Sequence, residues 1–161
     1  MGRSVGHERE EPGRGVLRRL DQAAELCAKR GQSLTPLRRQ VLGIVLAADR
    51  PLGAYDVLEI LARDRGRVAP PTVYRSLDFL VEQGLVHKVL SVNGFVACSS
   101  VARPHDAQLF ICRACGGSTE VPHRPAAGPI EAEADELGFA VESVVLEVRG
   151  LCRDCQGSAA A

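Results

Sequence analysis

Two pairs of cysteines in the second half of the chain have the residue type and spacing of a metal site. Cys112 and Cys115 form one C-x-x-C element, and Cys152 and Cys155 form the other. A C-x-x-C turn can direct two thiolates at one ion, and Zn²⁺ takes four such ligands in a tetrahedron. The 36 residues between the pairs exceed the spacing of a compact zinc ribbon, so the ion would join two distant stretches of chain. Two disulfides, or two reactive redox pairs, are the alternatives.

A second group of possible ligands is spread over a shorter stretch. His87, Cys98, His105 and Glu120 lie within 34 residues of one another, and their side chains offer the nitrogen, sulfur and oxygen atoms that zinc accepts. Isolated histidines are more commonly surface or core residues, and Cys98 could be buried for packing alone, so both interpretations stay open. His123 is interpreted as a surface residue, with an extra or substitute ligand as the alternative.

The composition limits where the chain works and what it binds. Its 161 residues suffice for one ordinary domain or two small ones. No apolar run is long enough to cross a bilayer, and residues 1–15 lack the apolar segment of a secretory signal, so we expect a cytoplasmic protein with reduced thiols. Residues 1–90 hold 15 basic and 11 acidic side chains, whereas residues 91–161 hold 5 and 9. This asymmetry favours a polyanionic partner for the first half.

Four helices are predicted in the first half, after a disordered arm over residues 1–15. Apolar residues at helical spacing predict helices over residues 16–30, 36–48, 54–62 and 70–83. Thr35 has the N-cap position of the second helix, and Gly84 ends the fourth. Cys27 in the first helix has no potential ligand within one turn, so we expect it to be buried.

A β-hairpin is predicted directly after the fourth helix. Residues 85–90 and 95–98 are two short β-prone runs around Asn93-Gly94. Helices followed by such a wing predict a winged helix-turn-helix domain over residues 16–98, in which the helix before the wing enters the major groove of DNA. The polar face of that helix is predicted to carry Thr72, Tyr74, Arg75 and Ser76. Arg can bind guanine and hydroxyls can bind phosphates, although an inert polar face is the alternative.

The remaining chain is predicted to form a small α/β domain over residues 105–157, after a hinge at residues 99–104 and before a tail at residues 158–161. Strands are expected over residues 108–112, 118–121 and 139–148, and a helix over residues 126–137. The fold class is therefore α+β, with a winged helix-turn-helix domain followed by an α/β domain clipped by a four-cysteine zinc site. A second metal bound across the hinge would fix the orientation of the two domains only when present.

Several stretches resemble the ferric uptake regulator superfamily of bacterial metal-responsive repressors. They are residues 34–42 (LTPLRRQVL), 71–80 (PTVYRSLDFL) and 84–89 (GLVHKV), together with the paired cysteines. Within the superfamily the chain is most similar to the zinc uptake regulator branch. That similarity rests on residues 54–58 (AYDVL), on His87-Lys88-Val89 and Cys98, and on residues 110–116 (FICRACG) and 150–155 (GLCRDC). The resemblance covers about residues 16–156.

The resemblance implies a homodimeric, zinc-responsive transcriptional repressor that binds palindromic operator DNA and controls zinc uptake and homeostasis genes. It implies two zinc ions per chain, dimerisation through residues 105–157, and neither an organic cofactor nor a membrane. The structural zinc would be held by Cys112, Cys115, Cys152 and Cys155. The regulatory zinc would be held by His87, Cys98, His105 and Glu120. The DNA contacts of the family correspond to Tyr55 and Arg75.

Three other functions are weighed against this one. A repressor of the same superfamily could sense iron, manganese or peroxide, but residues 104–108 hold one histidine where iron sensors have several, and the Cys98 thiolate favours zinc. A thiol redox enzyme would place a C-x-x-C element at the start of a helix in a βαβ unit, which neither pair matches. A zinc-ribbon interaction module without a DNA role is the third. No phosphate loop, HExxH motif or Ser/His/Asp arrangement predicts an enzyme.

Overall fold

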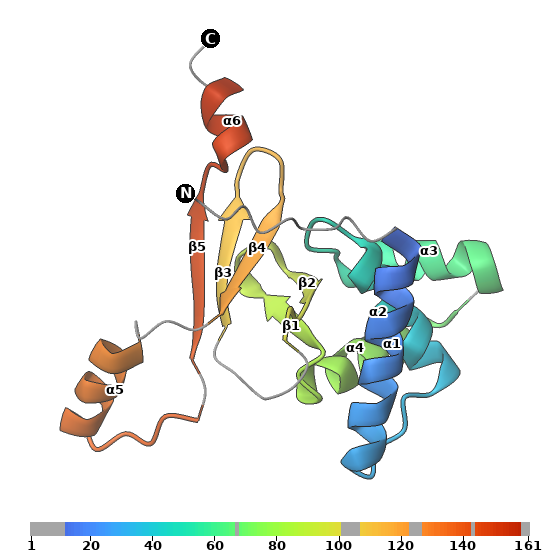
Figure 1. The fold of residues 1–161 in the computed structure, drawn as a ribbon, viewed down its shortest axis with the longest axis horizontal. Coiled ribbons are helices and arrows are strands. Elements are labelled where there is room, and N and C mark those ends of the chain that lie inside the picture. The colour runs from blue at the N-terminus through green and yellow to red at the C-terminus, as the bar shows by residue number, and fades with distance from the viewer. Residues whose placement is uncertain (1–11, 67, 101–106, 123–126, 143, 159–161) are drawn as a thin grey trace, which may run out of the picture.

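A helical part and a three-stranded sheet make up the computed structural model, which describes residues 12–66, 68–100, 107–122, 127–142 and 144–158 (Figure 1). The helical part contains α1 (Pro12–Lys29), α2 (Pro36–Ala47), α3 (Ala54–Arg65) and α4 (Pro70–Glu82), followed by the hairpin strands β1 (Val86–Val89) and β2 (Gly94–Ala97). The second part contains β3 (Ala107–Cys112), β4 (Ser118–Pro122), α5 (Ala127–Glu136), β5 (Val145–Gly150) and α6 (Arg153–Ser158). No helix of the described residues has the length and apolar character needed to cross a bilayer.

The helical part has one apolar core, to which all four helices contribute. Its fully buried side chains include Leu42, Leu61, Leu77, Leu80 and Cys27. The Thr35 hydroxyl caps the start of α2 by accepting from the backbone N–H of Arg38, as its N-cap position predicts. The burial of Cys27 and the second, third and fourth helices are thus confirmed. Burying one face of α4 leaves its opposite face toward solvent.

The first helix begins earlier than the sequence predicts. α1 starts at Pro12, within the segment predicted to be a disordered arm, and residues 1–11 of that segment lie outside the described part. Proline is tolerated here because its missing N–H would have no helical partner in the first turn. The buried stripe of α1 runs through Leu20, Ala23 and Cys27, whereas Leu17, one of the apolar residues at helical spacing, is 58% exposed.

The predicted hairpin is confirmed, although its connection is longer than a two-residue turn. β1 and β2 pair from Val86↔Ala97 to Val89↔Gly94, and a 3-10 turn over Leu90–Val92 leads into Asn93, which has a left-handed φ of 47°. Gly94 lacks the Cβ that would lie 2.9 Å from Pro51. The close approach of the chain before α3 therefore requires glycine here.

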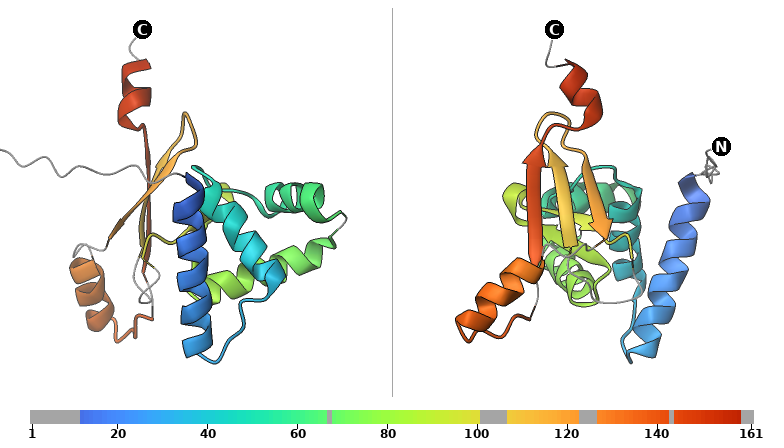
Figure 2. Two further views of the ribbon diagram at one scale, coloured as in Figure 1. Left: turned by 45° about the vertical axis from the view of Figure 1, so that its right-hand side comes forward. Right: turned by 60° about the vertical axis from the view of Figure 1, so that its left-hand side comes forward.

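The C-terminal sheet has the strand order β4-β3-β5, with β4 antiparallel and β5 parallel to β3 (Figure 2). The predicted strand over residues 139–148 is wrong in its first half, because the strand covers only Val145–Gly150. Phe139 and Val141 have no strand partner and are exposed. The helix α6 is missing from the sequence prediction, and it includes the first residue of the predicted tail. Residues 101–106, with most of the predicted hinge, lie outside the described part.

A small second core joins the wing to the sheet. Val89 and Val96 of the hairpin are buried with Leu109 and Ile111 of β3. These β3 residues alternate with Phe110, which is 44% exposed on the opposite face, as the two-residue period of a strand requires. One face of the sheet is therefore covered by the wing, and the other faces away from it.

Candidate metal centres and nucleic-acid interface

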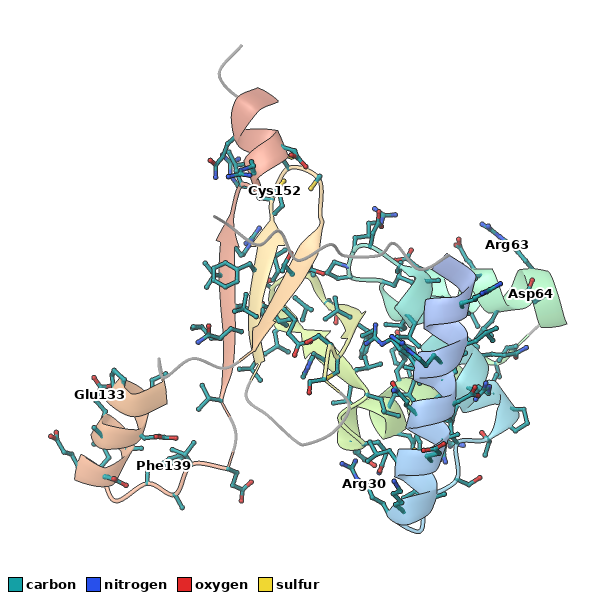
Figure 3. All side chains as sticks on the ribbon, in the orientation of Figure 1. Arg30, Arg63, Asp64, Glu133, Phe139 and Cys152 are labelled. Atoms are coloured by element: carbon teal, nitrogen blue, oxygen red, sulfur yellow. The ribbon has the colours of Figure 1, made fainter. Side chains whose placement is uncertain are left out.

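The four paired cysteines meet at one end of the C-terminal sheet. Their sulfur atoms all lie within 4.8 Å of one another, and the Sγ atoms of Cys115 and Cys152 are 3.9 Å apart. The parallel pairing of β3 with β5 aligns Cys112 with Gly150, which brings the two C-x-x-C elements together. Figure 3 shows Cys152 at the end of the sheet far from Phe139 and α5. None of the six cysteines forms a disulfide.

Backbone N–H groups lie close to two sulfur atoms of this cluster. N–H groups of Cys115, Cys152 and Ala114 lower the pKa of the Cys112 thiol to about 6, and the N–H of Gly117 lies 3.4 Å from the Cys115 sulfur. Hydrogen bonds with the sulfurs of Cys152 and Cys112 raise the pKa of Cys155 to about 12. Four thiolates this close repel one another, and a divalent cation among them removes that penalty. The donor set and its compactness fit zinc.

Three of the four other predicted ligands also come together. Donor atoms of His87, Cys98 and Glu120 lie within 4.8 Å of one another, and the Nε2 atom of His87 is 3.3 Å from the Oε1 atom of Glu120. The cluster is well shielded, because Cys98 is fully buried and the side chains of His87 and Glu120 are 14% and 4% exposed. The fourth predicted ligand, His105, and the alternative ligand His123 both lie outside the described residues.

The electrostatics of this cluster also favour a bound cation. Burial and the neighbouring Glu120 charge raise the pKa of Cys98 to about 11, against smaller opposite effects of the Ser100 backbone and of Arg19. The other carboxylate oxygen of Glu120 accepts a hydrogen bond of 2.6 Å from the N–H of Ser99. A buried carboxylate and a buried sulfur beside an imidazole form a mixed donor set suited to zinc.

The polar surface of α4 and the start of α3 form the candidate nucleic-acid interface. The rings of Tyr55 and Tyr74 stack edge to face, with centroids 6.5 Å apart, and both remain exposed. Arg75 is exposed next to them, and Thr72 is half-buried. Ser76 is a correction: it is 4% exposed, and its hydroxyl donates to the backbone oxygen of Thr72 at 2.8 Å. Ser76 therefore belongs to the inner face of α4.

Two contacts between segments that are distant along the chain cannot be predicted from the sequence. Arg19 of α1 donates through Nη2 to the backbone oxygen of Cys98, which is 79 residues away. The Glu147 carboxylate on β5 accepts from the backbone N–H groups of Leu90 and Ser91, at 2.6 and 3.0 Å. Both pairs are distant along the chain, so local patterns could not reveal them.

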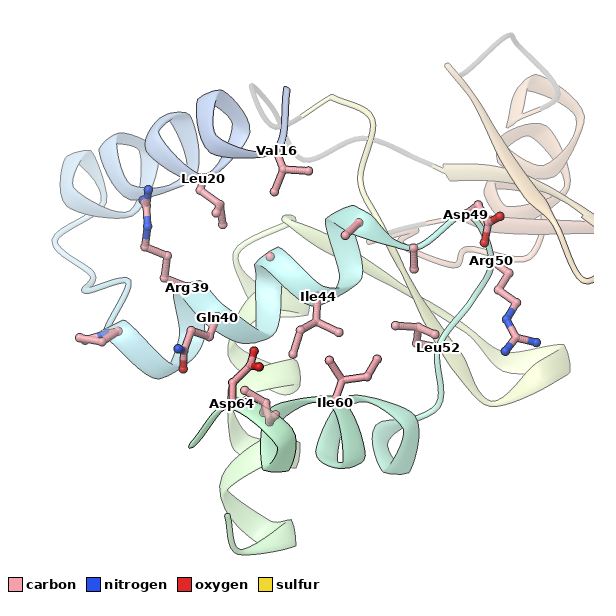
Figure 4. A pocket seen from close by; sticks show the side chains of 15 residues that line it. Val16, Leu20, Arg39, Gln40, Ile44, Asp49, Arg50, Leu52, Ile60 and Asp64 are labelled. Carbon is pink, nitrogen blue, oxygen red and sulfur yellow. The ribbon is translucent and has the colours of Figure 1, made fainter. Parts of the chain in front are cut away.

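A hollow in the helical part is lined by other residues than the predicted metal ligands. It has a volume of about 780 Å³ and runs between α1, α2 and α3, with Leu20, Ile44 and Ile60 on its walls (Figure 4). Its polar lining includes Arg39 and Asp64, and none of the predicted ligands or DNA contacts borders it. The metal chemistry of the chain is therefore separate from this groove.

Comparison with known proteins identifies the fold as that of a known family. The sequence profile of the "Ferric uptake regulator family" matches residues 29–149. The "Zinc uptake regulation protein" of Escherichia coli (strain K12) is 42% identical over 137 residues, which cover 84% of this chain and 80% of that protein.

Solved structures extend the comparison to the arrangement of the two parts. A zinc uptake regulator complexed with zinc and DNA has a TM-score of 0.87 at 39% identity, covering 91% of this chain and 98% of that one. Holo XcZur has a TM-score of 0.78 at 41% identity, and apo XcZur has a TM-score of 0.51 at 39% identity, each covering 88% of this chain and 97% of the other. The chain belongs to the ferric uptake regulator family, in the zinc uptake regulator branch that its motifs predict.

Proposed function

We propose that the chain is a zinc-responsive transcriptional repressor that binds operator DNA as a homodimer in the cytoplasm. The observation that carries the proposal is the cluster of His87, Cys98 and Glu120, because it draws its donors from both parts of the molecule. His87 belongs to the wing, Cys98 follows it, and Glu120 belongs to the C-terminal sheet. A cation held by all three would stabilise one orientation of the DNA-binding part against the sheet.

The comparison with holo and apo XcZur supports this coupling. Holo and apo XcZur are almost equally identical to this chain, yet their TM-scores are 0.78 and 0.51. This chain therefore superposes better on the holo form than on the apo form. Side chains that already converge on one point are preorganised for the ion, which lowers the cost of binding.

Each cluster has its own role in the proposal. Cys112, Cys115, Cys152 and Cys155 would hold a structural zinc that joins β3 to α6. His87, Cys98 and Glu120, with His105 as the fourth ligand, would hold the regulatory zinc. The expected content is two zinc ions per chain. Zinc supplies positive charge and fixed tetrahedral geometry at both places, and no chemical reaction is required, so we propose a regulator and not an enzyme.

The DNA-binding surface would be the exposed face around α4. Arg75 could contact guanine in the major groove, and Tyr55, Thr72 and Tyr74 could contact phosphates through their hydroxyls. In a symmetric dimer, two such helices must lie about one helical turn of DNA apart, or a multiple of it. The orientation of the helical part against the dimer would therefore decide the affinity for a palindromic operator.

The uncovered face of the C-terminal sheet supports the dimer. Phe110 and Val148 are neighbours on paired strands, and they are 44% and 37% exposed on the face away from the wing. Leu137 and Phe139 add further exposed apolar surface in the segment before β5, which is an edge strand of the sheet. Apolar side chains gathered on an edge strand and one open face are typical of a surface that a second copy covers.

The proposal is tested by DNA binding in zinc buffers. Cys98→Ser should keep the fold and the structural zinc but lose zinc-dependent binding to a palindromic operator in a gel shift. Cys27→Ala is the matched control, because Cys27 is also buried but lies outside both clusters. Tight binding of the Cys98→Ser protein to the operator without added zinc would refute the proposed control of DNA binding by zinc. A response of the native protein to Fe²⁺ or Mn²⁺ but not to Zn²⁺ would instead support an iron or manganese sensor.

A further inference from the structure

Arg19 brings a positive charge from α1 to the edge of the mixed-ligand cluster. Its guanidinium donates to the backbone oxygen of Cys98. Arg19 and Glu120 also line the same cavity of about 180 Å³, together with Asp49 and Arg50. The hydrogen bond and the shared cavity place the Arg19 charge beside these two ligands.

The charge of the cluster changes when a metal enters. A zinc ion would add two positive charges to the cluster, which lies beside the Arg19 guanidinium. The Arg19 guanidinium is a fixed cation beside the cluster. It is therefore more stable there when the cluster is empty than when zinc fills it. Asp49 and Arg50, the other charged groups of the cavity, have opposite signs and leave this preference unchanged.

We propose that Arg19 sets the zinc affinity of the regulatory cluster, acting as a counter-charge that stabilises the empty site and raises the zinc concentration needed to fill it. This inference rests on the proposed regulatory role of His87, Cys98 and Glu120. Arg19 donates to the backbone of one ligand, so it is a positioning residue. Its charge and its hydrogen bond act in opposite directions, because the hydrogen bond holds Cys98 in place.

The direction in which Arg19→Gln changes the zinc affinity distinguishes the effect of the charge from that of the hydrogen bond. If the charge dominates, Arg19→Gln, which removes the charge and retains an amide donor, should bind regulatory zinc about tenfold more tightly. Arg19→Lys, which retains the charge, should stay within about threefold of the native protein. If Arg19 served only to hold the Cys98 backbone, Arg19→Gln would bind zinc equally or more weakly, and that result would overturn the proposal.

The experiment uses the full chain with its four-cysteine site loaded with zinc. Zinc binding to the second site is measured by competition with a chelator, and Co²⁺ binding is followed by the thiolate-to-cobalt absorption of Cys98. Arg30→Gln is the matched control, because Arg30 also donates to a backbone oxygen, that of Gln83 at 2.7 Å, but lies outside the cluster. It should leave the second site unchanged.

Failure of this inference can be told from failure of the proposed function. If the native protein takes up no metal at the second site, both are wrong. If it does, and zinc increases operator binding, but Arg19→Gln does not tighten zinc binding, only the role of Arg19 is wrong. If Arg19→Gln tightens zinc binding, its operator binding should reach the native level at saturating zinc and appear at about tenfold lower free zinc.

Discussion

The Nε2 atom of His87 lies 3.3 Å from the Oε1 atom of Glu120, and this contact joins the wing to the C-terminal sheet. The two residues belong to β1 and β4, which form separate sheets. Their side chains are nevertheless only 14% and 4% exposed. A shielded imidazole–carboxylate pair is stable only where both groups stay in place. The contact therefore depends on the orientation of the wing relative to the C-terminal sheet.

Replacing His87 should separate metal sensing from folding. His87→Ala removes one nitrogen ligand and leaves the four-cysteine cluster intact, so the protein should remain a folded dimer with one zinc per chain. Its operator affinity in excess zinc should fall by at least about tenfold, because zinc no longer stabilises one orientation of the DNA-binding part against the sheet. Fluorescence anisotropy and metal analysis measure both quantities. Lys88→Ala, at the exposed neighbouring position, is the control and should keep its zinc response.

Replacing a cysteine of the four-cysteine cluster should have a different consequence. Cys112→Ser removes a ligand whose zinc joins β3 to α6 in a sheet with a very small core. Loss of a structural zinc costs several kcal/mol, which should lower the thermal midpoint by roughly 10 °C or more and dissociate the dimer. Calorimetry and sedimentation test this. A Cys112→Ser protein that stays a stable dimer would show that this cluster has no structural role.

Arg75 should contribute to DNA affinity without affecting zinc. Arg75→Ala removes an exposed cation from the polar face of α4, so operator binding should weaken by about 1–3 kcal/mol at constant salt while zinc content and stability stay unchanged. Lys29→Ala, at the exposed end of α1, removes the same charge from another surface and should bind operator normally. Equal losses in the two variants would point to a nonspecific electrostatic effect.

Glu147 should make the contact between wing and sheet sensitive to acid. Partial burial raises the pKa of Glu147, but the hydrogen bonds from Ser91 and Leu90 lower it by more. The pKa in the folded chain therefore lies below its ordinary value of 4.5. A lowered pKa means that this stabilisation is present above about pH 4.5 and is lost as the pH falls through the folded-state value. Protonation removes the charge that strengthens both hydrogen bonds.

The comparison of Glu147→Gln with the native protein tests this dependence. At pH 7 the variant should be less stable by about 1 kcal/mol in urea unfolding, the usual contribution of such hydrogen bonds. The difference should shrink as the pH falls through the folded-state pKa of Glu147, which lies below its ordinary value, and it should disappear where the native carboxyl is protonated as well. Glu142→Gln, at an exposed position, is the control and should match the native protein throughout. A stability difference that persists unchanged into acid would contradict the role of the Glu147 charge.

Local sequence patterns predict much of this fold because the determining residues are neighbours in the chain. Thr35 and Pro36 mark the start of α2, and Asn93-Gly94 marks the wing. Patterns fail where tertiary contacts decide: Phe139 and Val141 alternate like a strand but find no partner strand. Ser76 looks polar, yet its hydroxyl is satisfied by the backbone of Thr72, which allows it to be buried.

Local spacing predicts one of the two sets of metal ligands but not the other. The spacing within Cys112–Cys115 and Cys152–Cys155 is a local signal, and the structure brings these four residues together. His87, Cys98 and Glu120 have no such spacing, and only the family resemblance favours them over ordinary surface or core residues. Arg19 and Glu147 contact the backbone of distant segments, so neither residue type nor spacing could identify them.

The central claim is that occupancy of the His87–Cys98–Glu120 cluster, and not of the four-cysteine cluster, controls DNA binding. The most direct measurement is operator affinity against buffered free zinc, with the zinc content per chain determined at each point. The account predicts that operator affinity stays low at one zinc per chain and rises as the content goes from one to two. Tight operator binding already at one zinc per chain, with no rise on filling the second site, would contradict it.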